Sequence, residues 1–124
     1  MRIKDFITES LGEAKQKTSS EEGGDCFVVS GKAMINNQIP NLKLVHAYVT
    51  GQGLLKGRRF EHAWNEIGDV VFDNSNGRKI IMRKEQYYEL GKVVQQPKQY
   101  AVYDRIQALT KMAQTKHYGP WDLE

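Results

Sequence analysis

Residues 60–73, FEHAWNEIGDVVFD, form the stretch of sequence that decides the fold. Two strand-like runs, residues 58–67 and 70–76, are separated there by Gly68 and Asp69. A two-residue loop that begins with glycine is typical of a type II′ turn between antiparallel strands. The sequence therefore predicts a tight β-hairpin.

The register of this hairpin brings a histidine and an aspartate together. Counting back from the turn places Asp73 opposite Trp64, and the same count places Ser75 opposite His62. Because side chains alternate between the two faces of a strand, all four lie on one face. His62 and Asp73 are then diagonal neighbours, roughly 7 Å apart at the backbone, and their side chains can touch. A carboxylate on one ring nitrogen fixes the imidazole tautomer and stabilises its protonated form.

The single cysteine of the chain, Cys26, follows a Gly-Gly-Asp run at residues 23–25, which marks a loop and a helix N-cap. The thiol would then lie in the first turn of a helix over residues 26–36. Backbone N–H groups and the helix dipole there favour a thiolate and can hold an oxyanion. A cysteine, a histidine and an aspartate are the parts of an acyl-transfer site, so we predict Cys26, His62 and Asp73 as catalytic residues.

Structural roles for the same residues stay open at this point. A single cysteine is often a small buried hydrophobe, and residues 26–30 are rich enough in β-forming residues to be a core strand. A histidine on a half-buried strand is likewise usually structural. The joint occurrence of the three residue types favours the enzyme.

Three further residues are candidates for binding the substrate. His46 and Tyr48 share one face of a strand predicted over residues 42–49 and could point into the same cleft as His62, and Trp64 shares the face of His62. A core role for His46 is the alternative. No metal site is predicted, because thiolate and imidazole ligands at the local spacing of zinc sites are absent, and no cofactor is expected.

Local signals also predict the elements that follow the hairpin. A short strand is expected at residues 79–82, a helix at 84–91 and a strand at 100–103. Asp104 can cap a last helix that runs to about residue 116. One apolar stripe of that helix is expected to face the core; it consists of Ile106, Leu109, Met112 and Ala113.

The order of these motifs resembles the bacterial transglutaminase-like branch of the papain-like cysteine enzymes. The likeness covers residues 24–76: a cysteine that opens a helix, the strand at 44–49, the His62-Ala63-Trp64 strand and an aspartate that ends the next strand. The chain departs from it at Asn65 and Asn74, where the family usually has valine and proline.

The resemblance implies an α+β fold with a papain-like (transglutaminase-like) core, in which an N-terminal nucleophile helix packs on an antiparallel sheet. Cys26 would be the nucleophile, His62 the base and acid, and Asp73 the residue that orients the ring. The enzyme would act on a protein or peptide-like amide through a thioester. Water as acceptor makes a peptidase or amidase, whereas an amine makes a transglutaminase.

A second likeness concerns the source of the chain. Residues 62–77, Tyr87-Tyr88 and residues 117–123 resemble small uncharacterised proteins of tailed bacteriophages. This implies the cytoplasm of a host cell as location and a host or virion protein as a candidate partner. Two other functions stay open: a non-catalytic protein-binding module on the same fold, and an ADP-ribosyltransferase, whose histidine and tyrosine motifs resemble residues 44–48 and Tyr87-Tyr88.

Composition sets the remaining limits. A chain of 124 residues with 40% hydrophobic residues has room for one domain with a modest core, which we place at residues 23–124 after an N-terminal helix and tether at 1–22. One cysteine rules out an internal disulfide and fits a reducing cytoplasm. No apolar run reaches membrane-spanning length. The 18 basic residues alternate with 15 acidic ones for a net charge of +3, so nucleic-acid binding is not expected.

Overall fold

The computed structural model of the chain describes residues 24–51 and 56–124, and the predicted segment 1–22 lies outside the described residues. Within the two described ranges, no helix is long and apolar enough to cross a membrane. These ranges form three α-helices, five β-strands and a short 3₁₀ helix, in the order α2 (Cys26–Asn36), β1 (Leu42–Thr50), β2 (Arg59–Ile67), β3 (Val70–Asp73), η2 (Ser75–Gly77), β4 (Ile80–Arg83), α3 (Lys84–Gly91), β5 (Tyr100–Tyr103) and α4 (Arg105–Thr115).

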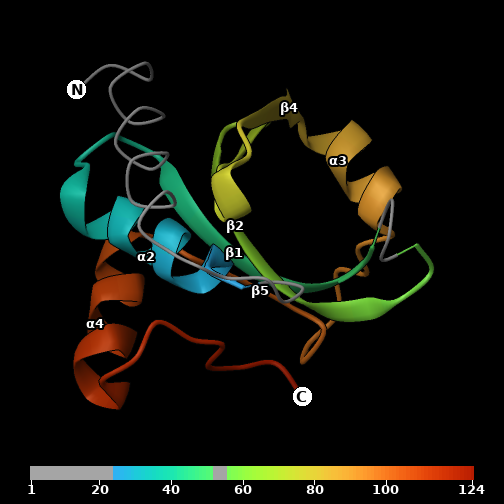
Figure 1. Cartoon of the computed structure of the whole chain (residues 1–124). Coiled ribbons are helices and arrows are strands. Elements are labelled where there is room, and N and C mark those ends of the chain that lie inside the picture. Colours follow the sequence, from blue (N-terminus) through green and yellow to red (C-terminus); the bar gives the residue numbers. More distant parts are fainter. Residues whose placement is uncertain (1–23, 52–55) are drawn as a thin grey trace.

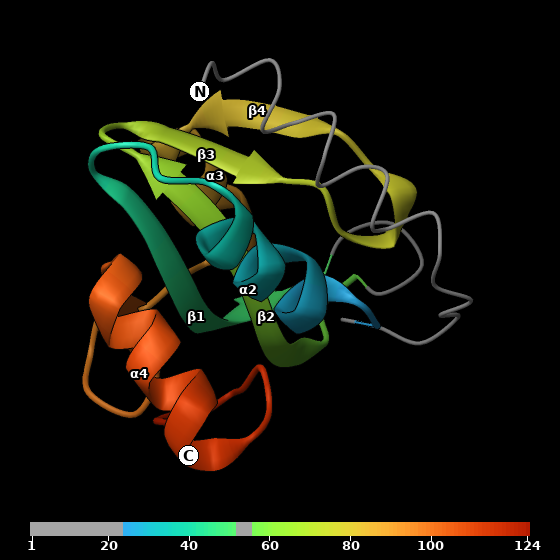
Figure 2. The ribbon, with the colours of Figure 1, turned by 90° about the vertical axis from the view of Figure 1, so that its left-hand side faces the viewer.

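The five strands form one antiparallel sheet in the order β4-β3-β2-β1-β5 (Figure 1). Helices α2 and α4 lie against one face of this sheet and α3 lies against the other (Figures 1 and 2). Each face has its own apolar core. The predicted α+β class with an antiparallel sheet is therefore confirmed.

The hairpin that joins β2 to β3 forms in the predicted register. Ile67 pairs with Val70, and Gly68 has the positive φ, 57°, that the first position of the turn requires. The second strand is shorter than predicted, because it ends at Asp73. Ser75 donates to the Asp73 carboxylate from both its backbone N–H and its hydroxyl, which turns the chain away from β2.

Helix α2 covers the predicted residues 26–36, so the alternative of a core strand at Cys26 is wrong. Asp25 occupies the N-cap position, but its side chain makes no capping hydrogen bond to the helix. Its Oδ1 instead accepts the backbone N–H of Asn76 at 2.6 Å. This bond connects the start of α2 to the turn after β3. Strand β3 pairs only with residues 65–67 at the end of β2.

The buried side of α4 differs from the predicted apolar stripe. Ala108 is fully buried and Met112 packs on the core of α2 and β1, whereas Ile106 is 75% exposed. Arg105 explains the rotation, because its Nε donates to the carbonyl of Met34 at 2.9 Å and its side chain thereby faces α2. The residues three and seven positions after Arg105 follow on the same side of the helix.

Candidate functional site

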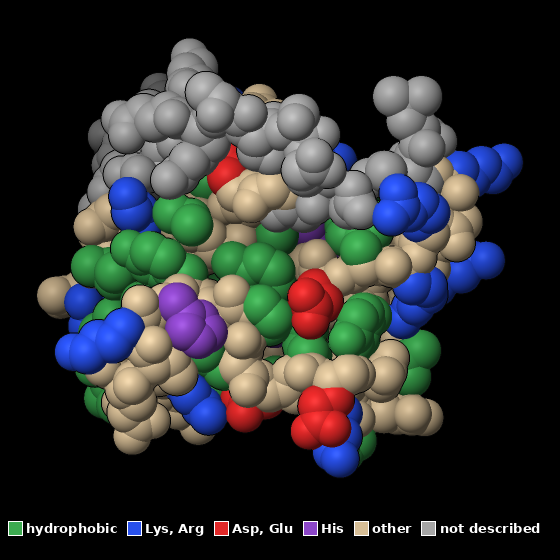
Figure 3. All heavy atoms as spheres, turned by 60° about the horizontal axis from the view of Figure 1, so that its bottom comes forward, with side chains coloured by type: hydrophobic (Ala, Val, Ile, Leu, Met, Phe, Trp, Pro, Cys, Tyr) green, Lys and Arg blue, Asp and Glu red, His purple; other side chains and the backbone are tan. Residues whose placement is uncertain are grey.

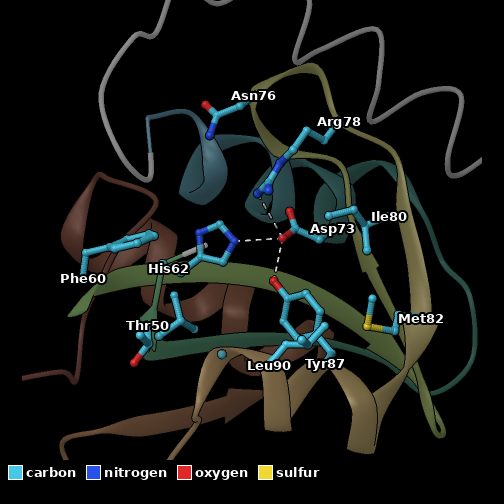
Figure 4. A pocket seen from close by; sticks show the side chains of 13 residues that line it. Thr50, Phe60, His62, Asp73, Asn76, Arg78, Ile80, Met82, Tyr87 and Leu90 are labelled. Atoms are coloured by element: carbon cyan, nitrogen blue, oxygen red, sulfur yellow. Dashed lines mark hydrogen bonds and ion pairs between the residues drawn. The ribbon is translucent and has the colours of Figure 1, made fainter. Parts of the chain in front are cut away.

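The His62 and Asp73 side chains meet on the sheet face that α3 covers (Figure 4). The ring nitrogen Nε2 of His62 lies 2.8 Å from Oδ2 of Asp73. Both residues are buried, with 4% and 1% of their surface exposed. The predicted contact between them is confirmed, although the strand ends before Ser75 could pair with His62.

Asp73 has several polar partners on this face. Its Oδ2 also accepts the hydroxyl of Tyr87 at 2.5 Å and lies 3.6 Å from the Arg78 guanidinium. Its Oδ1 accepts the Ser75 hydroxyl at 2.7 Å. Burial by itself would raise the pKa of Asp73, but His62, Tyr87 and Arg78 together hold that pKa below its usual range. Asp73 is therefore a fixed anion at neutral pH.

The same pairing decides the charge of the imidazole. Burial by itself lowers the pKa of His62, but the Asp73 carboxylate and the nearby Cys26 side chain more than offset this and raise that pKa to about 10. The rings of Phe60 and Trp64 pack on either side along the strand, each with its centroid 5.9 Å from that of the imidazole. His62 is thus an oriented imidazolium at neutral pH.

Cys26 is a free cysteine at the start of α2, and its side chain is fully buried. It lies close enough to His62 to raise the pKa of the imidazole, so all three predicted catalytic residues come together. Nε2 of the ring is hydrogen-bonded to Asp73, whereas the buried Nδ1 has no hydrogen-bond partner within the described part of the chain. Nδ1 is the nitrogen left for the thiol.

A cavity of about 330 Å³ opens beside the imidazole (Figure 4). His62, Asp73 and Tyr87 line one part of it, and Asn76 and Arg78 lie along one side. The rest of the described wall is mainly apolar and comes from β1, β2, β4 and α3. Cys26 is not among the described residues that line it. The cavity therefore reaches the histidine and aspartate, while the thiol lies behind the surface.

Trp64, predicted to bind substrate, is a core residue. Only 1% of its surface is exposed, and its Nε1 donates to Oε2 of Glu66 at 2.8 Å. Its ring packs on those of Tyr87 and Tyr88, with centroids 5.0 and 5.8 Å apart. The prediction that Trp64 binds substrate is therefore corrected. Trp64 packs against His62, Tyr87 and Tyr88, and almost none of its surface is accessible to a substrate.

His46 and Tyr48 do share a strand face, as predicted, but it is the opposite face of the sheet. Ala47 pairs with His62, so Ala47 shares the side of His62 and its two neighbours point away. Neither neighbour is among the residues that line the described cavity wall. The prediction that they bind substrate in the cleft of His62 is wrong. The ADP-ribosyltransferase alternative loses support for the same reason, because His46 and Tyr87 lie on different faces.

His46 lies in an aromatic cage. The rings of Phe27, Tyr103 and Trp121 surround it with centroids 4.9, 5.1 and 4.9 Å away. Burial lowers the pKa of His46 to about 3, and Asp122 opposes this shift only weakly. Neither ring nitrogen has a hydrogen-bond partner in the described ranges. His46 is thus a neutral core residue, which was the alternative left open by the sequence.

The sequence pattern did not identify the other groups that hold Asp73. Arg78 lies in the segment before β4, and Tyr87 lies on α3. No spacing rule in the sequence connects either residue to Asp73. Ser75 did carry a signal, because an aspartate two residues before a serine favours a local side-chain turn. That signal would also have shortened the predicted strand.

The surface charge and the ligand types bear on other chemistries. On the face seen in Figure 3, several Lys and Arg side chains gather along the right-hand edge, and those on the rest of the face lie apart. No group of three or more His, Cys, Asp or Glu side chains within residues 24–51 and 56–124 could hold a metal ion. Comparisons with models of known families, with curated proteins and with solved structures gave no match.

Proposed function

We propose that this chain is a cysteine-dependent amide hydrolase or acyl transferase on a transglutaminase-like, papain-like fold. The observation that carries the proposal is the buried imidazole of His62, which is bonded to Asp73 at Nε2 and lies near the free thiol at the start of α2. The substrate would be a protein or peptide-like amide, for which a host or virion protein in the cytoplasm is a candidate.

The reaction would proceed in two steps. In the first, the thiolate of Cys26 attacks the amide carbonyl, and His62 gives its proton to the leaving amine as the C–N bond breaks. The product is a thioester. In the second, neutral His62 takes a proton from water or an acceptor amine, which attacks the thioester and releases the thiolate. Asp73 keeps the ring oriented throughout.

The start of α2 supports a further part of this reaction. The first N–H groups of a helix have no partner within the helix, and the Asp25 side chain leaves them without its capping bond. These groups lie next to Cys26, where negative charge develops on the carbonyl oxygen during attack. They would stabilise this oxyanion without needing to reorient.

One observation favours a second candidate, a binding module without chemistry. The Cys26 side chain is fully buried, although a nucleophile must meet its substrate. In this alternative the cavity beside His62 would hold a segment of a partner protein, and the thiol would only pack against the imidazole. Both candidates use the same cavity, so reactivity must separate them.

The deciding experiment measures the labelling of Cys26 with iodoacetamide at pH 7. For the enzyme, we expect rapid labelling that falls by at least about tenfold in His62→Ala, since the imidazolium stabilises the thiolate. His46→Leu serves as the matched control, because it also removes a buried histidine but from the other face, and it should label like the intact chain. Circular dichroism checks that each variant is folded.

Two results would reject the enzyme. In the first, Cys26 reacts only after denaturation; in the second, it reacts at one rate in all three proteins. If Cys26 does react, peptide mixtures with hydroxylamine test the thioester, which would be trapped as a hydroxamate. Release of a free amine or incorporation of a labelled cadaverine then shows whether water or an amine is the acceptor.

A further inference from the structure

We infer that the cavity beside His62 binds one large apolar side chain of the substrate, such as leucine, methionine or phenylalanine, next to the amide that reacts. The inference rests on the proposed function, and it adds the class of substrate residue that the site selects. It follows from the composition of the cavity wall, its size, its charges and its place next to the imidazole.

The wall is apolar over most of its described extent. Its hydrophobic side chains converge from four different elements: Val49 on β1, Phe60 on β2, Ile80 and Met82 on β4, and Leu90 on α3. In Figure 4 the labelled side chains of β4 lie across the opening from Phe60, with the imidazole and the carboxylate between them. An apolar group placed there would be removed from water on several sides.

The volume is ample for one large apolar side chain. At about 330 Å³ the cavity is near the lower end of the roughly 300–1,000 Å³ typical of ligand pockets. Burial of one large apolar side chain strengthens binding by roughly 10- to 100-fold, which is enough to select among peptide residues.

The polar groups of the cavity do not favour a charged occupant. The imidazole and the Tyr87 hydroxyl both bond to Asp73, so the carboxylate is already matched by two donors and by the Arg78 guanidinium. A lysine side chain would meet the positive charges of His62 and Arg78, and the described wall of the cavity offers it no carboxylate without a partner. It would lose water without a compensating bond.

The position of the cavity connects binding to reaction. His62 lines the cavity on one side and lies near Cys26 on the other. A side chain anchored in the cavity would therefore hold the adjoining amide within reach of the imidazole that must protonate the leaving amine. Such anchoring lowers the entropic cost of reaching the reactive geometry.

The test uses the full chain with Cys26→Ala, which cannot form a thioester. Fluorescence polarisation measures its binding of labelled, acetylated peptide amides of glycine, serine and glutamine, which carry one test residue: alanine, leucine, phenylalanine, lysine or glutamate. We expect leucine or phenylalanine to bind at least about tenfold more tightly than alanine. Lysine should bind no better than alanine. A glutamate optimum would assign the cavity to acidic groups through Arg78 and overturn the inference.

Strand β4 offers a matched pair of variants. Ile80 and Met82 line the cavity, whereas Ile81, between them, points to the other face and is 50% exposed. Met82→Lys should remove most of the preference for leucine over alanine, and Ile81→Lys should leave it within about twofold. Met82→Ala gives a milder loss if the lysine variant fails to fold. Equal effects of substitution at both positions would contradict the inference.

The inference and the proposed function can fail separately. If peptides bind with an apolar preference that Met82→Lys removes, but the intact chain forms no thioester, the cavity assignment stands and the enzyme is rejected. If the intact chain forms a thioester with peptides regardless of the test residue, the enzyme stands and the cavity assignment is wrong.

Discussion

The two faces of the sheet each bury a histidine among aromatic rings, and at neutral pH one histidine is positively charged whereas the other is neutral. On the α3 face, Asp73 and Cys26 raise the pKa of His62 to about 10 against the effect of burial. On the α2 and α4 face, burial lowers the pKa of His46 to about 3. Burial and aromatic packing are common to both, so they do not explain the difference.

The difference lies in what the nearest carboxylate is bonded to. Asp73 is buried and accepts directly from His62. Asp122, the carboxylate near His46, instead accepts the Tyr103 hydroxyl at 2.6 Å and lies 3.3 Å from the Lys111 ammonium. The comparison teaches that a buried histidine becomes a candidate acid where a buried carboxylate accepts a hydrogen bond directly from its ring. The following predictions test that statement.

Asp73→Asn should have the largest effect. Without the carboxylate, burial dominates and the pKa of His62 should fall from about 10 to below its ordinary value of 6.5. Breaking a buried ion pair costs about 3–5 kcal/mol of folding stability, and loss of the orienting carboxylate lowers acyl transfer on the order of 10⁴-fold in a serine enzyme triad. NMR titration of the His62 ring measures the pKa. Asp122→Asn is the control and should leave His46 neutral; a His62 that still titrates above pH 8 in Asp73→Asn would refute the assigned cause.

His46 should make the protein sensitive to acid. Its pKa is about 3 in the folded state and 6.5 when unfolded, so the unfolded state binds more protons between these values. The free energy of unfolding should therefore fall as pH drops from 6.5 towards 3, by up to about 5 kcal/mol from this residue. His62 has the opposite sign: its raised pKa stabilises the fold fully below pH 6.5, and this contribution is lost as pH rises towards 10.

Urea unfolding at pH 7 and pH 4 measures the acid effect. His46→Leu should lose less stability between the two pH values than the intact chain does, because leucine cannot take up the proton. Ile106→Leu, at an exposed position of α4, should keep the full loss. If the His46→Leu variant is as sensitive to acid as the intact chain, protonation of His46 in its aromatic cage is not the cause of the acid sensitivity.

Gly119→Ala should disrupt the cage without replacing a titrating group. A Cβ there would lie 2.5 Å from Cε1 of His46, and the φ of +110° is itself unfavourable for alanine. We expect a loss of about 3 kcal/mol in the free energy of unfolding, from overpacking together with backbone strain. Gly68→Ala is the matched control, since a Cβ at that turn meets nothing within 4 Å; it should cost only about 1 kcal/mol. Equal costs, measured by thermal unfolding, would argue against tight packing around His46.

The smallest effects compare two tyrosines, each bonded to the carboxylate of its own face. Tyr87→Phe removes a donor to buried Asp73 and should cost about 2 kcal/mol. Tyr103→Phe removes a donor to exposed Asp122, which water can replace, and should cost about 0.5 kcal/mol. Urea unfolding gives both values. A larger loss of stability for Tyr103→Phe than for Tyr87→Phe would show that Asp122 depends more on its tyrosine donor than Asp73 does.

Much of the candidate site could be predicted because its signals are local. Gly68-Asp69 fixed the hairpin, and the hairpin fixed the register that joins His62 to Asp73 across eleven residues. The helix at residues 26–36 followed from the Gly-Gly-Asp run before it. The turn and the helix start each depend on the backbone conformation of a few adjacent residues, so short sequence patterns are enough to predict them.

The substrate-binding residues were predicted wrongly because their placement depends on distant pairing. Alternation put His46 and Tyr48 on one face, but the register of β1 against β2 decides which face that is. A shift of one residue would have brought His46 to the side of His62. The residues between these strands carry no turn signal comparable to Gly68-Asp69, so the sequence leaves this register open.

By itself, the sequence determined the residue types of the site and the turn that joins two of them, since both depend on near neighbours along the chain. Only the tertiary structure decided that His62 is charged and His46 neutral, that Tyr87 and Arg78 hold Asp73, and that the thiol is buried. The physical reason is that a pKa depends on solvent exposure and on distances to charges, and these arise only when remote segments pack together.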